Sequence, residues 1–313
     1  MKTLYFDCFS GISGDMVIGA LIDAGADPNG LAEDLKKLNI KDEYEVQWKK
    51  IVKNGITSTK FDILLKENFH HEHDHHHHHE HGHHHEYDHH HEHGHHHEHG
   101  HHHEHSHHHE HGHHHEHGHH HEHSHHHEHD HHHDHYYEHE HHHHHRSYRD
   151  IVTMIESSEL SNEVKETALK IFKKIGEAEG HIHGLPLDNV HFHEVGAVDS
   201  IIDIVGTAIL IHQLGIQKVK SSSIPVGTGK IHIDHGIYPV PAPATLEILR
   251  GIPIAQSEVK FELTTPTGAA IAAVLAEDFC TLPSIKVTSI GYGAGTKTFK
   301  DRPNVLRVII GEE

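Results

Sequence analysis

Residues 1–25 read MKTLYFDCFSGISGDMVIGALIDAG and determine how the fold begins. Residues 4–9 alternate aromatic with polar side chains, a pattern that predicts a strand. The glycine-rich turn 10–14 breaks this strand, and Asp15 stands where a helix would start. Residues 16–24 are apolar at helical spacing. The stretch therefore predicts a strand, a tight turn and a helix in direct succession.

Strand and helix patterns alternate through most of the remaining chain. Asn54-Gly55 is a favoured hairpin turn pair and separates two of the predicted strands. The alternation predicts an α/β or α+β body with a mixed sheet and flanking helices. The further predicted helices are residues 31–38, 147–155, 164–175, 198–214, 241–250 and 266–276, and the further predicted strands are residues 44–52, 56–65, 190–195, 219–226, 258–263, 285–290 and 305–310.

A histidine-rich tract from His70 to His145 interrupts this body and holds 50 of the 57 histidines. Its repeat is His-His-His-Glu-His-Gly, with Ser or Asp sometimes in place of Gly. Neutral imidazole binds nickel, zinc and copper, so the tract predicts metal storage, with room for roughly a dozen ions. Because it has no apolar face, it also predicts a disordered insertion. The alternative is a low-complexity linker that binds metal only incidentally.

The rest of the chain has the composition of an ordinary, mildly acidic protein. The tract supplies 16 of the 47 acidic residues and no Lys or Arg, so little net charge remains outside it. Nothing there indicates a nucleic-acid surface. Cys8 and Cys280 indicate no disulfide framework. The sequence contains no apolar run of about 18 residues, so it predicts no membrane span. The N-terminus does not resemble a signal peptide, so we expect a cytoplasmic protein.

These patterns divide the chain into three parts. Residues 1–69 form the first part of the α/β body, residues 70–146 the insertion, and residues 147–313 the remainder of the body.

Several histidines outside the tract are candidate metal ligands. On a strand, His191 and His193 would project from one face, and His181 and His183 make a second pair of the same spacing. Asp203 lies on a strongly apolar predicted helix, where a carboxylate is costly unless a cation binds it. The alternative is a pair of solvent-facing histidines with no metal. The predicted metal ligands are His181, His183, His191, His193, Asp203, His232 and His235, with the working metal site in the body around His191 and His193.

The glycine turn and two later loops are candidate sites for a phosphate. Backbone N–H groups at the start of a helix bind phosphate or carboxylate. Asp7 and Asp15 bracket the first turn, and we predict them with Glu194 as catalytic residues. The alternative is a plain turn with Asp15 as the helix cap, and Asp199 is predicted to cap the apolar helix. The predicted cofactor-binding residues are Ser10, Gly11, Gly14, Lys230, Thr264, Thr265, Thr267 and Gly268.

Five segments together carry a family resemblance: YFDCFSGISGDM, VHFHEVGAVDSIIDIVG, HGIYPVPAPATLEILRG, ELTTPTGAA and RPNVLRVIIGE. In this order they resemble the LarC-type nickel insertion proteins, across residues 1–69 and 147–313. A His-rich insertion at this position is also similar to the family.

The resemblance implies a nickel insertase, a lyase-type cyclometallase. Such a protein places nickel in the pyridinium bisthiocarboxylate mononucleotide that becomes the nickel-pincer cofactor of lactate racemase-type enzymes. A nickel–carbon bond forms and CTP is consumed. In the family a smaller C-terminal domain is implied to bind CTP with Mn or Mg. This chain stops at Glu313, so we expect it to need that domain, either separately made or added by a frameshift.

The resemblance also implies partners. They are the mononucleotide substrate, the C-terminal CTP-binding domain, the sulfur-inserting enzyme and the apo-racemase, and we expect a homo-oligomer. Two other functions stay open. One is a nickel store or chaperone without turnover, and the other is a metal-dependent phosphoester hydrolase using Asp7, Asp15, His191 and His193.

Overall fold

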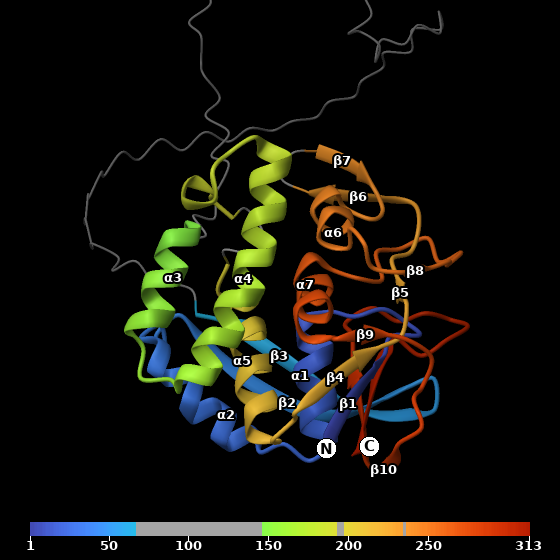
Figure 1. The fold of residues 1–313 in the computed structure, drawn as a ribbon. Helices are drawn as coiled ribbons and strands as arrows, with labels where there is room; N and C mark the ends of the chain where they lie inside the picture. The colour runs from blue at the N-terminus through green and yellow to red at the C-terminus, as the bar shows by residue number, and fades with distance from the viewer. Residues whose placement is uncertain (67–145, 193–196, 234–235) are drawn as a thin grey trace, which may run out of the picture. The chain divides into compact units, whose positions relative to one another are not determined.

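A seven-stranded mixed sheet forms the base of the fold (Figure 1). β1 (Lys2–Asp7) runs parallel to β4 (Lys218–Ser221) and antiparallel to β11 (Val305–Glu312). The strand order is β2-β3-β10-β11-β1-β4-β9, which confirms the predicted mixed sheet. The remaining strands of this sheet are β2 (Tyr44–Lys53), β3 (Ile56–Leu65), β9 (Asp278–Phe279) and β10 (Lys286–Ala294).

The structure is a computed structural model that describes residues 1–66, 146–192, 197–233 and 236–313. The histidine tract and its assignment as a disordered insertion therefore lie outside the described residues. In the described parts, no helix combines the length and the apolarity needed to cross a membrane.

Helices stack over the sheet in successive layers (Figure 1). α1 (Gly14–Asp23) packs directly on β10 and β3, α5 (Val198–Gln213) packs on α1, and α4 (Asn162–His183) packs on α5. Fully buried side chains such as Phe6, Ile18 and Val205 fill the space between these layers. The other helices are α2 (Pro28–Leu35), α3 (Tyr148–Ser157), α6 (Pro243–Ile248) and α7 (Pro266–Leu275), with short 3₁₀ turns at Lys36–Leu38 and Leu187–Asn189. Two small sheets pair β5 (Ile224–Pro225) with β8 (Ile254–Ala255), and β6 (Lys230–Ile233) with β7 (Gly236–Pro239).

Glycines let the backbone of α1 touch the backbone of the sheet. A Cβ added at Gly291 or Gly293 of β10 would lie closer than 3.0 Å to the carbonyl oxygen of Ala20 or Met16. The same holds in reverse, because a Cβ at Gly19 of α1 would collide with the Thr59 carbonyl oxygen of β3. The helix therefore sits on the sheet with no layer of side chains between them at these points.

The two described ends that flank the histidine tract meet at one residue. The Lys66 backbone N–H donates to the Glu43 carbonyl oxygen at 2.9 Å. The Arg146 guanidinium donates to both Glu43 carboxylate oxygens, at 2.6 and 2.7 Å. Glu43 thus holds both ends of the interruption close together.

Four local predictions differ from the structure. The single strand predicted at residues 219–226 is divided into β4 and β5, which belong to different sheets. The helix predicted at residues 164–175 continues to His183, because residues 176–183 include buried Ala178 and Gly180, which pack inward. The strand predicted at residues 258–263 does not form, because Glu262 bridges Gly227 and Thr264 bridges Ile12 in separate loops. Of the strand predicted at residues 190–195, the described part makes only an isolated bridge between His191 and Ser147.

Candidate functional site

The N-terminal ends of three helices meet at one pocket of about 510 Å³. Ser13, Gly14, Asp15 and Met16 come from the start of α1, and Thr265, Pro266 and Thr267 from the start of α7. Asp199, Ser200 and Asp203 come from the start of α5. The N-terminus of a helix carries N–H groups without intrahelical partners and the positive end of the helix dipole, and both attract an anion.

Backbone hydrogen bonds join the first glycine turn to the Thr-Pro-Thr-Gly loop. The Ile12 N–H donates to the Leu263 carbonyl oxygen at 3.1 Å, and the Thr265 N–H donates to the Ile12 carbonyl oxygen at 3.2 Å. A Cβ at Gly268 would collide with the Ile12 carbonyl oxygen, so only glycine permits this approach. Two of the three segments predicted to bind phosphate are therefore joined into one wall of the pocket.

The three helices that begin at the pocket have different N-cap residues. The α1 cap is Ser13, and Asp15 lies in the first turn, which corrects the prediction that Asp15 starts the helix. The α7 cap is Thr265, whose side chain accepts a hydrogen bond from the Gly268 N–H at 3.1 Å. The α5 cap is Ala197, so Asp199 is not the cap, and its carboxylate accepts from the Ser200 N–H at 2.7 Å.

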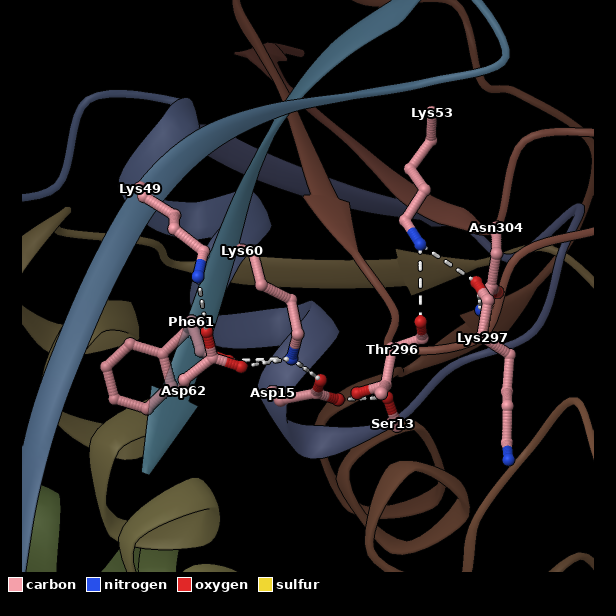
Figure 2. A network of polar contacts seen from close by, with 10 residues as sticks. All are labelled: Ser13, Asp15, Lys49, Lys53, Lys60, Phe61, Asp62, Thr296, Lys297 and Asn304. Atoms are coloured by element: carbon pink, nitrogen blue, oxygen red, sulfur yellow. Dashed lines mark hydrogen bonds and ion pairs between the residues drawn. The ribbon is translucent and has the colours of Figure 1, made fainter. Parts of the chain in front are cut away.

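A buried lysine and two carboxylates form one side of the pocket (Figure 2). The Lys60 ammonium lies 2.6 Å from an Asp15 carboxylate oxygen and 3.1 Å from an Asp62 oxygen, and its side chain is 9% exposed. The Ser13 hydroxyl donates to the other Asp15 oxygen. Burial alone would lower the pKa of Lys60, but the Asp15 and Asp62 carboxylates outweigh burial and raise it. Lys60 is therefore a fixed cation that neutralises part of the acidic charge.

The loop that carries Lys297 borders the same pocket (Figure 2). The Lys53 ammonium donates to the carbonyl oxygens of Thr296 and Lys297 at 3.3 and 3.0 Å, and the Asn304 amide also donates to the Lys297 carbonyl oxygen at 3.0 Å. The Lys297 ammonium lies 5.4 Å from the centre of the Phe261 ring. These contacts fix the backbone of the loop and leave the Lys297 charge at the pocket.

Asp203 is the most unusual group in the pocket. Its Oδ1 atom is buried with no hydrogen-bond partner in the described part of the chain. Its carboxylate lies against the start of α1, where a Cβ at Gly14 would collide with it. Burial, and then the negative charges of Asp15 and Asp199, raise the pKa of Asp203 well above its usual value, although Lys60 opposes them.

This raised pKa predicts a pH-dependent difference in stability between the protein and its Asp203→Asn variant. An acid whose pKa rises on folding stabilises the fold at low pH, and that contribution is lost as pH rises through the raised pKa. The free energy of unfolding of the variant should therefore increase relative to that of the wild type as the pH rises above about 4. Urea titrations at several pH values measure this difference, and parallel pH curves for both proteins would contradict it.

The structure separates Asp7 from Asp15. Asp7 accepts a hydrogen bond from Arg307 Nε at 2.8 Å and lines a different pocket of about 850 Å³, together with Cys8. Burial raises the pKa of the Cys8 thiol to about 12, so it is not a reactive thiolate. The predicted pair of carboxylates around the turn is therefore not brought together, because the two side chains enter different pockets.

The predicted metal ligands do not gather among the described residues. His181 and His183 are two positions apart on α4, so they lie on different faces of that helix, and His183 is 3.3 Å from Glu179. His191 and His232 are exposed, and Asp203 lies in the pocket instead. Across the described ranges, no three His, Cys, Asp or Glu side chains are grouped to hold a metal ion. His193, Glu194 and His235 lie outside the described residues.

Five of the eight predicted phosphate-binding residues line the pocket or hold its loops together, and the other three do not. Gly14, Thr265 and Thr267 line the pocket, and Gly11 and Gly268 hold its loops together. The remaining three lie elsewhere or have structural partners: the Ser10 hydroxyl donates to the Pro303 carbonyl oxygen at 2.7 Å, the Thr264 hydroxyl to the Pro225 carbonyl oxygen at 2.7 Å, and Lys230 is exposed on β6.

Sequence reasoning missed Lys60, Asp62 and Lys297. A signal existed for the first two, because residues two apart on a strand share a face, so Lys60 and Asp62 of β3 had to project together. No local pattern marked Lys297.

The fold and this pocket define a mixed α/β protein with a pocket at the starts of three helices. The family model described as "Nickel insertion protein" matches residues 4–313, so the chain belongs to the nickel insertion protein family.

Curated relatives agree with this assignment. The chain is 46% identical over 313 residues to the pyridinium-3,5-bisthiocarboxylic acid mononucleotide nickel insertion protein of Geobacillus kaustophilus (strain HTA426), covering 100% of this chain and 60% of that protein. Proteins of the same name from Clostridium acetobutylicum and Clostridium kluyveri are 44% and 42% identical, over 100% of this chain and 64% and 63% of their own length. The chain thus spans about three fifths of the length of these relatives. No solved structure matches the chain significantly.

Proposed function

We propose that the chain takes part in inserting nickel into pyridinium-3,5-bisthiocarboxylic acid mononucleotide, the compound in its relatives' names, and that the pocket binds this mononucleotide. The observation that carries the proposal is the meeting of three helix N-termini at one pocket. A mononucleotide brings one phosphate, and one phosphate needs only a few backbone donors at a helix start.

The start of α7 is the best-suited place for the phosphate. Thr267 is 6% exposed, lines the pocket, and its hydroxyl has no hydrogen-bond partner among the described residues. Lys297 adds a positive charge and forms no ion pair with a described carboxylate. A hydroxyl, a cation and a helix dipole together suit a phosphate monoester.

The start of α5 suits the other end of the ligand. Asp199 and Asp203 lie there, and a pyridinium ring carries a positive charge that carboxylates attract. The phosphate would then bind at the start of α7 and the ring at the start of α5, with Lys60 neutralising Asp15 and Asp62 in the same pocket.

The histidine tract would supply the nickel. Imidazole at this density can hold many ions, so the tract is proposed as a reservoir and not as the insertion site, which needs fixed geometry. A nickel store without turnover is the second candidate, and the tract alone supports it. The hydrolase alternative is not favoured, because Asp7 and Asp15 line different pockets.

CTP, a C-terminal domain, the sulfur-inserting enzyme and a lactate racemase-type acceptor belong to the same proposal through the sequence resemblance. Among the described residues, no three metal-binding side chains are grouped, and the proposal places CTP with the C-terminal domain that the resemblance implies.

Mononucleotide binding tests the phosphate site. Thr267→Ala and Lys297→Met should each weaken binding of the nickel-free mononucleotide by about tenfold or more, because a hydrogen bond to a charged group contributes about 1.5–3 kcal/mol. Calorimetry measures this, and Lys286→Met, an exposed lysine of β10, is the matched control. Binding of the nucleoside, which lacks the phosphate, should not respond to either change. Equal losses for nucleotide and nucleoside, or no loss for either, would place the phosphate elsewhere.

A further inference from the structure

We propose that Asp203 is the base that takes the ring hydrogen of the pyridinium when nickel becomes bound between the two thiocarboxylates. This inference rests on the proposed function and adds a catalytic residue to it. Thiocarboxylates at ring positions 3 and 5 flank one carbon that carries hydrogen, so a nickel ion held by both sulfurs lies at that carbon.

The step balances without an oxidant or a reductant. The carbon–hydrogen bond breaks, its electron pair forms the nickel–carbon bond, and the proton passes to Asp203 Oδ1. Nickel stays divalent throughout, and the proton later leaves to solvent. A proton acceptor close to the ring is therefore the one group that the protein must supply for this step.

Asp203 has a carboxylate oxygen available for this role. Its Oδ1 is buried and has no hydrogen-bond partner among the described residues, although the side chain lines the pocket. The rest of the carboxylate is held against the first turn of α1 beside Gly14. One oxygen is thus fixed by the helix while the other remains for a ligand.

The neighbouring carboxylates are already engaged. Asp15 binds Lys60 at 2.6 Å and accepts the Ser13 hydroxyl, and Asp62 lies 3.1 Å from Lys60. Asp199 accepts the Ser200 N–H at 2.7 Å. Glu262, the remaining pocket carboxylate, has an interaction partner, although its Oε1, like Asp203 Oδ1, is buried without a hydrogen-bond partner among the described residues. Ion pairing and hydrogen bonding make a carboxylate a weaker base, so Asp203 and Glu262 are the two candidate acceptors, and Asp203 is the one whose carboxylate is fixed against the start of α1.

The charges that face Asp203 support the same role. Burial and the charges of Asp15 and Asp199 raise its pKa, and Lys60 opposes them. A raised pKa makes the carboxylate a better proton acceptor near neutral pH. Since the base must begin deprotonated, the insertion rate should rise with pH through this pKa and then level off.

Single-turnover insertion tests the assignment. The full chain, together with the separately expressed C-terminal domain and in excess over the nickel-free mononucleotide, is mixed with nickel, CTP and Mn or Mg, and mass spectrometry follows the gain of nickel with loss of one hydrogen. Asp203→Asn should slow insertion by about 100-fold or more and remove the rising limb of the pH profile. Its dissociation constant for the mononucleotide, measured separately, should rise no more than that of Asp199→Asn, which removes the same attraction for the pyridinium charge.

The variants Asp199→Asn and Glu262→Gln, together with the wild type, distinguish a wrong assignment of the base from a wrong proposed function. Asp199→Asn removes the same charge from the same helix and should slow insertion by less than about tenfold. If Asp203→Asn inserts nickel as fast as the wild type, or if Glu262→Gln alone abolishes the rising limb, the assignment is wrong while the proposed function stands. If the wild-type chain binds no mononucleotide, the proposed function fails and the assignment fails with it.

Discussion

Removing residues 70–145 is expected to lower the nickel bound per chain from roughly a dozen ions to about two or fewer, given about four imidazole ligands per ion. The deleted segment holds 50 of the 57 histidines, so most of the binding capacity leaves with it. Equilibrium dialysis with metal analysis measures the stoichiometry. Because the deletion removes ligands and not a buried core, the urea midpoint of the body should change little.

The described ends on either side of the deleted segment lie close together, so the deletion should not disturb the folded body. Lys66 and Arg146 both bind Glu43, so a short Gly-Ser linker can join the two described ends without moving either. A second variant that keeps the tract's length but replaces its histidines with asparagine should lose the same nickel. An unfolded deletion variant would show that the tract is part of the body, and unchanged stoichiometry would show that nickel binds elsewhere.

Gly11→Ala is expected to cause the largest loss of stability among single substitutions near the pocket. Gly11 has a φ of +98°, a conformation that alanine adopts only under strain, and an added Cβ would collide with the Leu263 carbonyl oxygen. Backbone strain and overpacking each cost about 1–3 kcal/mol, so the sum is roughly 2–6 kcal/mol. The substitution should also weaken mononucleotide binding, because it separates the two loops that form the pocket wall.

Gly25→Ala is the matched control for this prediction. Gly25 has a φ of +114°, but nothing lies within 4 Å of an added Cβ, so only backbone strain remains. Chemical denaturation of both variants isolates the cost of the collision as the difference between them. Equal losses of stability would mean that the contact between the Gly11 turn and Leu263 contributes nothing, and mononucleotide binding would then be expected to survive.

The parts of the site that follow one continuous stretch of chain could be predicted from the sequence. The strand, turn and helix of residues 1–25 form as expected, since alternation, glycine spacing and helical periodicity are local signals. Thr265 caps α7 as the Thr-Pro-Thr-Gly pattern indicates, with Pro266 in the first turn. Of the three segments predicted to bind phosphate, the first glycine turn and the Thr-Pro-Thr-Gly loop lie at the pocket, whereas the loop that carries Lys230 does not line it.

The parts that depend on long-range pairing could not be predicted. Lys60 reaches the pocket because β3 pairs with β10, which is more than 200 residues away in the sequence. Asp7 and Asp15 lie near each other along the chain, yet β1 and α1 direct them into separate pockets. His181 and His183 were assigned to one face on the assumption of a strand, and the longer α4 changes that periodicity from two residues to 3.6.

The direct seating of α1 on β10 determines how the pocket meets a ligand. A helix separated from its sheet by side chains can slide as those side chains change rotamer, whereas backbone packed on backbone has no such freedom. The start of α1 is therefore a preformed wall of the pocket when the ligand arrives. Binding orders little of the chain on this side, and the loss of conformational entropy that weakens many complexes is correspondingly small.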